Sequence, residues 1–272
     1  MAQGIGSMNR SQRKVQWRGS HVWITGASTG IGRALAIELA ACGATLWLTS
    51  RRAALLDSVV QEIRSQGGVA VGLPADVTDL NAMKDCVRQI ESDGGSIDVL
   101  IANAGTHIPS AHQEFDSLQY QSLMDINYGG VLHAIEAALP GMRRRGRGHL
   151  VGVASLAGYR ALPTAAAYGA SKSALIHFLQ SLRFHLEPES ISVTVVNPGF
   201  VRTPLTDKND FHMPCLIEAT DAAEHIRRGL ERGHRDISFP RLFSWTIALL
   251  RIIPMPWYAF LMRRIWKKAE QA

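Results

Sequence analysis

The sequence has few cysteines and no metal-binding pattern. Its three cysteines, Cys42, Cys86 and Cys215, are widely spaced, and no two of them form a Cys-x-x-Cys pair. An odd, scattered set argues against a disulfide scaffold and indicates a reducing compartment with buried thiols. The ten histidines include no His-Glu-x-x-His and no paired Cys/His spacing. We therefore expect no metal site.

The beginning of the chain lacks the apolar core of a secretory signal. The first 18 residues are polar, whereas 46% of the whole chain is hydrophobic and 19% is charged. That composition is typical of an ordinary globular protein and argues against disorder. We expect a cytoplasmic protein whose 272 residues form one large domain.

The body of the chain has no excess of basic over acidic residues. The formal net charge is +6, but eight basic residues lie in the two tails: Arg10, Arg13, Lys14, Arg18, Arg263, Arg264, Lys267 and Lys268. Without these eight and Glu270, 21 basic residues stand against 22 acidic ones. A nucleic-acid-binding domain carries a basic face on its body, so we expect no nucleic-acid partner.

Short apolar runs alternate with helical patterns, which is typical of a parallel sheet covered on both faces. The expected strands are 22–25, 45–49, 69–73, 99–102, 150–154 and 193–196, with a short seventh at 237–239. The expected helices are about 31–42, 53–66, 80–92, 116–145 and 168–186. The pattern predicts an α/β fold: a Rossmann-like, doubly wound parallel sheet of about seven strands in three α/β/α layers. This single domain covers residues 19–240, between a polar basic tail (1–18) and an apolar, basic extension (241–272).

A glycine-rich turn follows the first expected strand and reads Thr25-Gly26-Ala27-Ser28-Thr29-Gly30-Ile31-Gly32. Gly26 permits a tight turn, Gly30 lets the backbone approach a pyrophosphate, and Gly32 allows close packing of helix on strand. Because a strand precedes the turn and a helix follows it, we favour a dinucleotide site over a simple glycine-rich connector. Ser28, Thr29 and Ile31 are then among the cofactor contacts.

The end of the second expected strand indicates which cofactor binds. Sites that prefer NAD place an acidic residue there, but this chain has Ser50 followed by Arg51 and Arg52. A guanidinium pairs well with a 2′-phosphate. The alternative is a solvated arginine pair opening a helix, although cations are disfavoured at a helix N-terminus. We predict NADP(H) over NAD(H).

Two further turns lie at the carboxyl ends of strands, where ligands bind in open α/β sheets. Asp76-Val77 follows the third strand, and Asp76 is a candidate acceptor for the adenine amino group. Asn103-Ala104-Gly105 follows the fourth, and its small residues leave room for the adenosine. Both turns also fit ordinary turn chemistry. His107 and His112 come next and are either at the mouth of the substrate pocket or simply exposed.

The strongest local pattern is Tyr168-Gly169-Ala170-Ser171-Lys172, with Ser155 at the end of the fifth expected strand. Residues four apart lie on one helix face, so Tyr168 and Lys172 can point into one cleft. A free tyrosine has a pKa of about 10, too high for efficient acid–base catalysis at neutral pH. A nearby lysine ammonium lowers that pKa by favouring the phenolate. Ser155 can hydrogen-bond the substrate oxygen.

Taken together, these motifs resemble the short-chain dehydrogenase/reductases over roughly residues 20–235. The matching set, in order, is Thr25-Gly26-x3-Gly30-Ile31-Gly32, Asn103-Ala104-Gly105, Asn127, Ser155, Tyr168-x3-Lys172 and Asn197-Pro198-Gly199. The resemblance implies that Asn127 supports a water relay to Lys172 and that Lys172 also holds the nicotinamide ribose. It further implies that Pro198, Val201 and Thr203, beside Gly199, fix the carboxamide end of the cofactor. Ser50 followed by Arg51 is similar to the NADP-preferring pattern, and we expect a homodimer or homotetramer.

The extension is unusual, because residues 242–266 read LFSWTIALLRIIPMPWYAFLMRRIW. Arg251, Pro254 and Pro256 interrupt it, and no run approaches the about 20 apolar residues of a spanning helix. Three interpretations stay open. The segment is a lid over the substrate cleft, an oligomer interface, or a peripheral membrane contact through residues 241–268, with its tryptophans at the headgroups and its basic end on anionic lipid.

The leading hypothesis is an NADPH-dependent oxidoreductase that interconverts a ketone or aldehyde and an alcohol. Tyr168 is its general acid/base, and the substrate is lipophilic, such as an acyl, long-chain-base, steroid or terpenoid carbonyl. The alternatives are a non-catalytic NADP(H)-binding regulatory protein and a membrane-surface module on the same fold. A non-catalytic protein predicts a damaged catalytic set, whereas Ser155, Tyr168 and Lys172 are all present.

Overall fold

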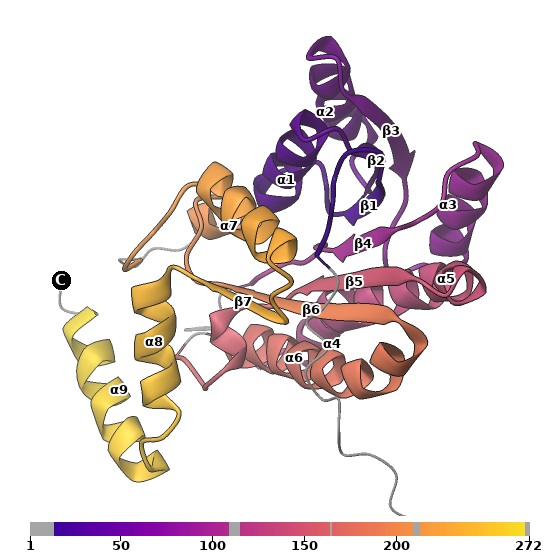
Figure 1. Ribbon diagram of the computed structural model, residues 1–272. Helices are drawn as coiled ribbons and strands as arrows, with labels where there is room; N and C mark the ends of the chain where they lie inside the picture. The colour runs from indigo at the N-terminus through magenta and orange to yellow at the C-terminus, as the bar shows by residue number, and fades with distance from the viewer. Residues whose placement is uncertain (1–13, 109–114, 164, 209–212, 270–272) are drawn as a thin grey trace, which may run out of the picture.

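Seven parallel strands form one sheet in the order β3-β2-β1-β4-β5-β6-β7 (Figure 1). The computed structural model describes residues 14–108, 115–163, 165–208 and 213–269, so residues 1–13 of the expected tail and His112 lie outside the described residues. The strands are β1 (His21–Thr25), β2 (Thr45–Ser50), β3 (Val69–Pro74), β4 (Val99–Ala102), β5 (Gly148–Val153), β6 (Ile191–Pro198) and β7 (Asp236–Phe239). The expected doubly wound sheet is confirmed, and its strand order reverses between β1 and β4.

Helices cover both faces of the sheet, which gives the expected three layers (Figure 1). One face carries α1 (Gly30–Ala41), α2 (Ala53–Ser65) and α7 (Ala219–Glu231). The other carries α3 (Leu80–Ser92), α5 (Gly130–Arg145) and α6 (Ala166–Leu186). The remaining elements are α4 (Ser117–Met124), α8 (Arg241–Leu250), α9 (Met255–Ala269), the π-helical turn η1 (Asp125–Gly129), and the 3-10 turns η2 (Leu156–Gly158), η3 (Glu187–Glu189) and η4 (Thr206–Lys208).

Burial on both faces explains why the strands read as continuous apolar runs. In β1, Val22 and Ile24 pack under α1 and α2, whereas Trp23 between them packs under α3 and α5. Trp47 of β2 lies in the same core as Trp23, and Leu46 and Leu48 lie in the opposite one. Alternate residues of one strand therefore enter two different cores, and both sets have to be apolar.

The long helix expected over residues 116–145 is divided, and this prediction was wrong in its continuity. The segment consists of α4, the π-helical turn η1 and α5. The turn coincides with Asn127, whose buried side chain bonds to the backbone of Thr106 and to Ser171. An extra residue in the turn re-aims a side chain, which is why π-helical turns occur at functional sites. Those bonds are tertiary, so helical periodicity could not reveal them.

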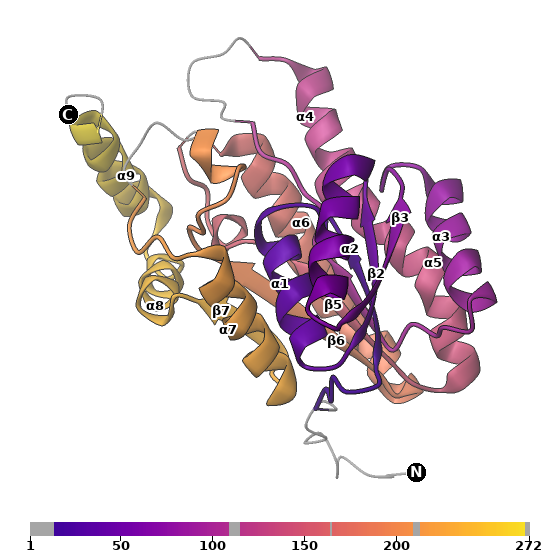
Figure 2. The ribbon, with the colours of Figure 1, turned by 90° about the horizontal axis from the view of Figure 1, so that it is seen from above.

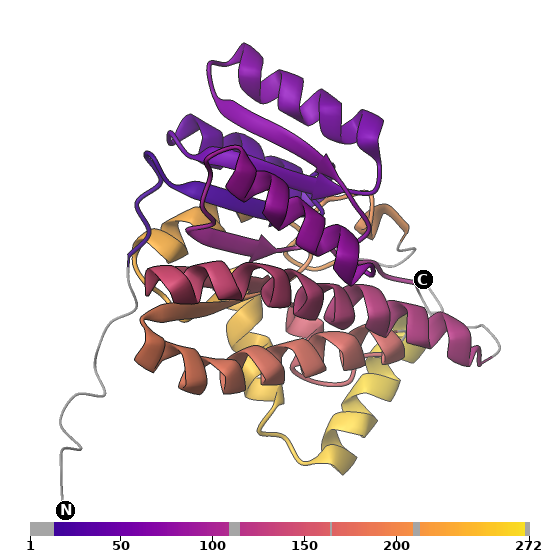
Figure 3. The same ribbon diagram turned by 90° about the vertical axis from the view of Figure 1, so that its right-hand side faces the viewer.

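The two ends of the parallel sheet differ in the segments that lie there. In Figure 2 and Figure 3 residues 14–20 lie at one end, whereas α4 and the end of α9 project at the other. Residues 14–20 precede β1, so the second end is the carboxyl-terminal edge of the parallel sheet.

The three cysteines depart in part from the expectation of buried thiols. Cys86 is buried, but Cys42 is half-buried and Cys215 is exposed.

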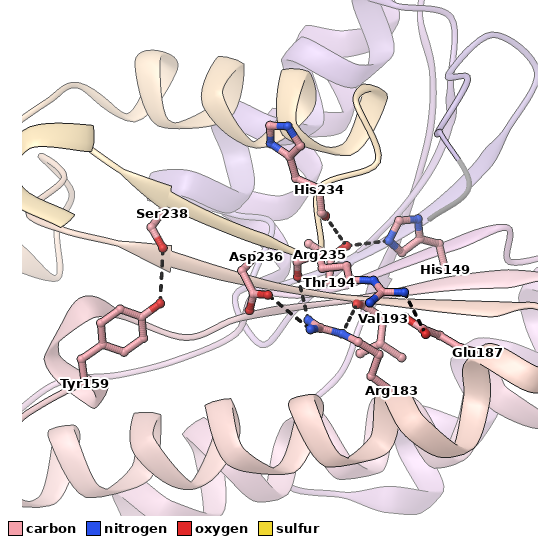
Figure 4. Close-up of polar contacts among 10 residues, drawn as sticks. All are labelled: His149, Tyr159, Arg183, Glu187, Val193, Thr194, His234, Arg235, Asp236 and Ser238. Carbon is pink, nitrogen blue, oxygen red and sulfur yellow. Dashed lines mark hydrogen bonds and ion pairs between the residues drawn. The ribbon is translucent and has the colours of Figure 1, made fainter. Parts of the chain in front are cut away.

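A polar network joins the amino ends of β5, β6 and β7 to the end of α6 (Figure 4). Arg183 of α6 donates to the carbonyl oxygens of Val193 and Arg235, at 3.2 and 2.8 Å, and pairs with Asp236 at 3.2 Å. On the other side of β6, His149 Nε2 lies 2.9 Å from Thr194 Oγ1. Burial lowers the pKa of His149 to about 4, so this ring is neutral in the folded protein at pH 7.

Candidate active site

The glycine turn lies where the strand order reverses, at the carboxyl ends of β1 and β4. Gly26 has a φ of 67°, and a Cβ on it would lie 2.7 Å from the Cα of Ala104. The Nδ2 group of Asn103 donates to the carbonyl oxygens of Thr25 and Gly26, at 3.1 and 3.2 Å. The Asn-Ala-Gly segment therefore braces the turn from the neighbouring strand, and any contact of these residues with adenosine stays a prediction.

The start of α1 is suited to an anion. Helix α3 is capped by Asp79 and α4 by Asp116, but the N-cap of α1, Thr29, makes no side-chain capping bond and the first turn holds no acidic residue. Uncapped N–H groups and the positive end of the helix dipole favour a phosphate. Gly30 keeps this approach open, because a Cβ there would lie 3.0 Å from Thr203 Cγ2.

The residues at the end of β2 contact the glycine turn. They are Ser50, Arg51 and Arg52. Ser50 Oγ donates to Ser28 Oγ at 2.8 Å, and Arg52 Nη2 donates to Thr29 Oγ1 at 2.9 Å. Arg51, whose side chain is 64% exposed, lies 3.5 Å from the carboxylate of Asp76. Two guanidinium groups thus flank the place where the resemblance expects the ribose of the adenosine. This is a donor set suited to a phosphate.

Asp76 and Val77 are placed differently from each other. Asp76 accepts hydrogen bonds from the backbone N–H and the hydroxyl of Thr78, at 2.9 and 2.8 Å. Burial alone would raise the pKa of Asp76, but the bonds from Thr78 and the nearby Arg51 outweigh it and lower that pKa. Val77 is buried against Gly130 of α5. The side chain of Val77 is thus part of the hydrophobic core, and a contact of Val77 with the cofactor would come from its backbone.

Tyr168, Lys172 and Ser155 come together as the spacing predicted. Lys172 is buried on α6, where its Nζ donates to the carbonyl oxygen of Val153 at 2.9 Å and lies 5.8 Å from the centre of the Tyr168 ring. Burial lowers the pKa of Lys172 to about 8. Burial of the Tyr168 hydroxyl raises its pKa, and a hydrogen bond with Ser155 acts in the opposite direction, so the expected lowering of this pKa beside Lys172 is not found. The Tyr168 hydroxyl is therefore protonated at neutral pH and can donate a proton.

Ser155 is held at the end of β5 by the turn that follows it. Its Oγ accepts a hydrogen bond from the N–H of Ala157 at 3.1 Å, which caps η2. The same hydroxyl lies 3.5 Å from the carbonyl oxygen of Pro198, the last residue of β6. The ends of the neighbouring strands β5 and β6 thus meet at the Ser155 hydroxyl.

Asn127 holds the site together through its side chain. Its Oδ1 accepts from the N–H of Thr106 at 2.7 Å, and its Nδ2 donates to the carbonyl oxygen of Thr106 at 2.9 Å and to Ser171 Oγ at 3.0 Å. A Cβ on Gly105 would lie 3.1 Å from Asn127 Oδ1 and 3.3 Å from Lys172 Nζ. Glycine at 105 therefore keeps the space between these side chains clear. The expected water relay stays a prediction.

The loop after β6 closes against the glycine turn. Val201 is buried and pairs with Ile217. The backbone N–H of Thr203 donates to Thr206 Oγ1 at 3.0 Å, while the methyl group of Thr203 faces Gly30. Gly199 packs under α8, since a Cβ on it would lie 2.9 Å from Phe243 Cδ1. Pro198, Gly199, Val201 and Thr203 thus form one wall opposite α1, and their contact with the carboxamide end of the cofactor stays a prediction.

Sequence reasoning did not assign two residues that the site uses. Ser171 links Asn127 to Tyr168, because its hydroxyl donates to the carbonyl oxygen of Tyr168 at 2.7 Å. The pentapeptide 168–172 contains Ser171, but the sequence alone shows only that this serine lies on the same helix as Tyr168 and Lys172. His107 was only a candidate for the pocket mouth. Its ring packs edge-on against that of Tyr168, with centroids 4.8 Å apart.

Fold and site together define an oxidoreductase of the doubly wound, dinucleotide-binding class. A family model described as short chain dehydrogenase matches residues 20–213, and the chain belongs to this family. An uncharacterized oxidoreductase of Myxococcus xanthus is 36% identical over 242 residues, which cover 89% of this chain and 96% of that protein. The 11-beta-hydroxysteroid dehydrogenase-like 3 of Arabidopsis thaliana is 33% identical over 240 residues, covering 86% and 77%.

A solved structure extends the comparison to the three-dimensional fold. The 3-oxoacyl-[acyl-carrier protein] reductase of Brucella melitensis, crystallised with bound NAD, has a TM-score of 0.73 and 29% identity. The match covers 82% of this chain and 90% of that one. The glycine turn, the uncapped start of α1 and the lack of a side chain at Gly105 fit a nicotinamide dinucleotide.

Proposed function

We propose that this protein interconverts a carbonyl compound and an alcohol with NADP(H), using Tyr168 as its general acid and base. The observation that carries the proposal is the buried ammonium of Lys172 one helical turn from Tyr168, with Ser155 hydrogen-bonded to the same phenol. A buried lysine is costly unless it serves an interaction. Here it lies beside the one phenol that a substrate oxygen could reach together with Ser155.

The roles of the side chains follow from their positions. The bound nicotinamide supplies the hydride in reduction and accepts it in oxidation. In reduction the Tyr168 hydroxyl donates its proton to the carbonyl oxygen, and the phenolate left behind is stabilised by the positive charge of Lys172. Ser155 donates a hydrogen bond to the same substrate oxygen as negative charge develops on it. Oxidation uses the same groups in reverse.

The preference for NADP(H) rests on Arg51 and Arg52. Residue 50, the place of the acidic residue in NAD-preferring sites, is a serine bonded to Ser28. The guanidinium of Arg52 lies on the glycine turn, and that of Arg51 is mostly exposed with only a long ion pair to Asp76. Both groups are available to a 2′-phosphate, which guanidinium binds in a bidentate manner.

A lipophilic substrate is supported by the surroundings of the site and by the relatives. Helix α8 packs on the loop at Gly199, and the ring of Phe243 lies 5.7 Å from that of Phe200. Apolar side chains therefore border the expected nicotinamide end. One relative is named for a hydroxysteroid and one structural neighbour for a 3-oxoacyl chain, and both names describe carbonyl chemistry on apolar skeletons.

The test compares Tyr168→Phe with the wild type in NADPH oxidation against carbonyls of graded chain length and ring size. Losing a general acid is expected to lower turnover by about 100- to 10,000-fold while NADPH binding, followed by fluorescence, stays unchanged. Tyr120→Phe, on α4, is the matched control and is expected to behave as the wild type. A fully active Tyr168→Phe enzyme contradicts the mechanism. A wild type that binds NADPH but reduces no carbonyl favours the non-catalytic alternative.

A further inference from the structure

The two C-terminal helices present large apolar side chains to solvent. Those of the segment 242–260 that are more than half exposed are Leu242 (76%), Trp245 (71%), Leu249 (66%), Ile252 (79%), Met255 (60%), Trp257 (70%) and Phe260 (58%). Exposed apolar residues scattered singly are normal, but a contiguous group of this size marks an interaction site. We call the exposed side of α8, α9 and their connection the C-terminal surface.

The spacing of these residues shows that the C-terminal surface is one face of each helix. Leu242, Trp245 and Leu249 recur at the interval of a helical stripe, and Trp257 and Phe260 do so in α9. The opposite faces are occupied, since Ile247 and Tyr258 are buried. The helices thus use one apolar side to pack on the domain and carry a second apolar side outward.

The charge of the C-terminal surface has a single sign. Residues 241–269 contain six basic residues and no acidic residue. Arg241, Arg251, Arg263 and Arg264 are exposed, and no acidic side chain among the described residues pairs with any of the four. Arginines of the body behave differently: Arg143, for example, binds Glu189 through two hydrogen bonds. Unpaired arginines also occur elsewhere, such as Arg52, but on the C-terminal surface they gather without any acidic residue among them.

We propose that the C-terminal surface binds an anionic lipid bilayer, with its tryptophans and leucines in the interfacial layer and its arginines on the headgroups. Aromatic and aliphatic side chains beside basic ones are the composition that membrane interfaces select. Two copies placed face to face would bring like charges together, which disfavours a second copy as the occupant. Among the described residues, no helix has the length and apolarity needed to cross a membrane, so the contact is peripheral.

Arg160 fixes this surface to the catalytic domain. It lies between Ser155 and Tyr168 and donates to the carbonyl oxygens of Leu250, Arg251 and Ile253 at 2.7, 2.8 and 2.7 Å. The contact continues at α9, where the Arg160 guanidinium lies 4.1 Å from the centre of the Tyr258 ring and the Tyr258 hydroxyl donates to Ala161. The helices that carry the C-terminal surface are therefore fixed to the β5–α6 connection on their inner side.

This placement has a consequence for the substrate that rests on the proposed function. If Tyr168 acts on a lipophilic carbonyl, the bilayer is a source of that substrate for a membrane-bound enzyme. Membrane binding itself does not depend on turnover. The two proposals can accordingly fail separately.

The test is co-sedimentation of the full chain with vesicles of phosphatidylcholine alone or with added phosphatidylserine. Each exposed basic residue is attracted to an anionic surface, so binding is expected to be at least about tenfold stronger with phosphatidylserine and to weaken at high salt. The triple variant Trp245→Ser, Leu249→Ser, Trp257→Ser is expected to lose about tenfold or more of this binding, because it removes buried apolar area.

The matched control replaces two equally exposed apolar residues elsewhere, Leu118→Ser and Phe184→Ser, which are 80% and 75% exposed. It is expected to sediment as the wild type does, and all variants are expected to keep NADPH binding and thermal stability. Equal binding to both kinds of vesicle, or none, overturns the proposal even if the enzyme is active. A triple variant that changes the oligomeric state by size exclusion and not vesicle binding identifies a second copy as the occupant and also overturns it.

Discussion

The side-chain amide of Asn127 donates a hydrogen bond to the hydroxyl of Ser171 at 3.0 Å, and this bond joins the π-helical turn η1 to the helix that carries Tyr168 and Lys172. Asn127 also binds both backbone groups of Thr106, just after β4. Three segments that are distant in the sequence are therefore fixed to one another through one amide. The position of the catalytic pair depends on this amide as well as on its own helix.

Replacing Asn127 by alanine is expected to weaken both the fold and the activity. The change leaves the N–H and carbonyl of Thr106 without their partner, which costs about 1–3 kcal/mol of the free energy of unfolding. Ser171→Ala removes one hydrogen bond from the amide and is expected to cost about 1 kcal/mol. Urea denaturation and steady-state kinetics measure both effects. Ser173→Ala, exposed on the same helix, is the control, and the positioning role is wrong if Ser171→Ala matches it in both measurements.

The rate of carbonyl reduction is expected to fall as the pH rises through about 8. Burial lowers the pKa of Lys172 to about 8, so its ammonium is present below that pH and is lost above it. Without the positive charge the phenolate formed at Tyr168 is no longer stabilised. The value of kcat/KM for NADPH, measured from pH 6 to 10, reports this ionisation in the free enzyme. A flat profile up to pH 10 would show that the charge of Lys172 is not needed.

Removing the arginines beside Ser50 is expected to change the choice of cofactor. Arg51→Ala and Arg52→Ala should each raise the KM for NADPH, by about tenfold or more for a lost charge-assisted contact, and leave the KM for NADH nearly unchanged. Arg33→Ala is a suitable control, because Arg33 lies on α1 but pairs with Glu62. If both cofactors lose affinity equally, the arginines support the turn and do not select the 2′-phosphate.

His149 is expected to make the fold sensitive to acid. Its pKa is about 4 in the folded protein and about 6.5 when unfolded, so below pH 6.5 the unfolded chain binds a proton that the folded chain excludes. The stability is complete above pH 6.5 and falls by about 3 kcal/mol as the pH drops to 4. Urea unfolding at pH 7 and 4.5 should show a smaller loss for His149→Gln than for the wild type. His185→Gln, exposed on α6, should lose as much as the wild type.

Much of the sheet could be predicted because both of its faces are buried. Residues 99–102 and the helix at 80–92 were predicted with their observed bounds, and the other strands differ by one or two residues at one or both ends. Helix α7 was not predicted, although its buried residues Ala222, Ala223, Ile226, Gly229 and Leu230 recur at helical spacing. The periodic pattern of this helix was present in the sequence, and its omission was an error of interpretation.

Residue spacing predicts those parts of the site whose residues lie close together in the sequence. Tyr168 and Lys172 are one helical turn apart, so their meeting needs no knowledge of the fold. The bond between Asn127 and Ser171 spans 44 residues, and that between Arg160 and Ile253 spans 93. No pattern in the sequence pairs such residues, because each contact exists only after the strands are in order.

The Arg160 contacts join parts of the chain that are synthesised at different times. The glycine turn, the strands and the Tyr168–Lys172 helix all precede residue 240. The carbonyl oxygens that Arg160 binds belong to Leu250, Arg251 and Ile253, which are made after them. A chain that ends near residue 240 would therefore keep every strand of the sheet but leave the guanidinium of Arg160 without these three acceptors.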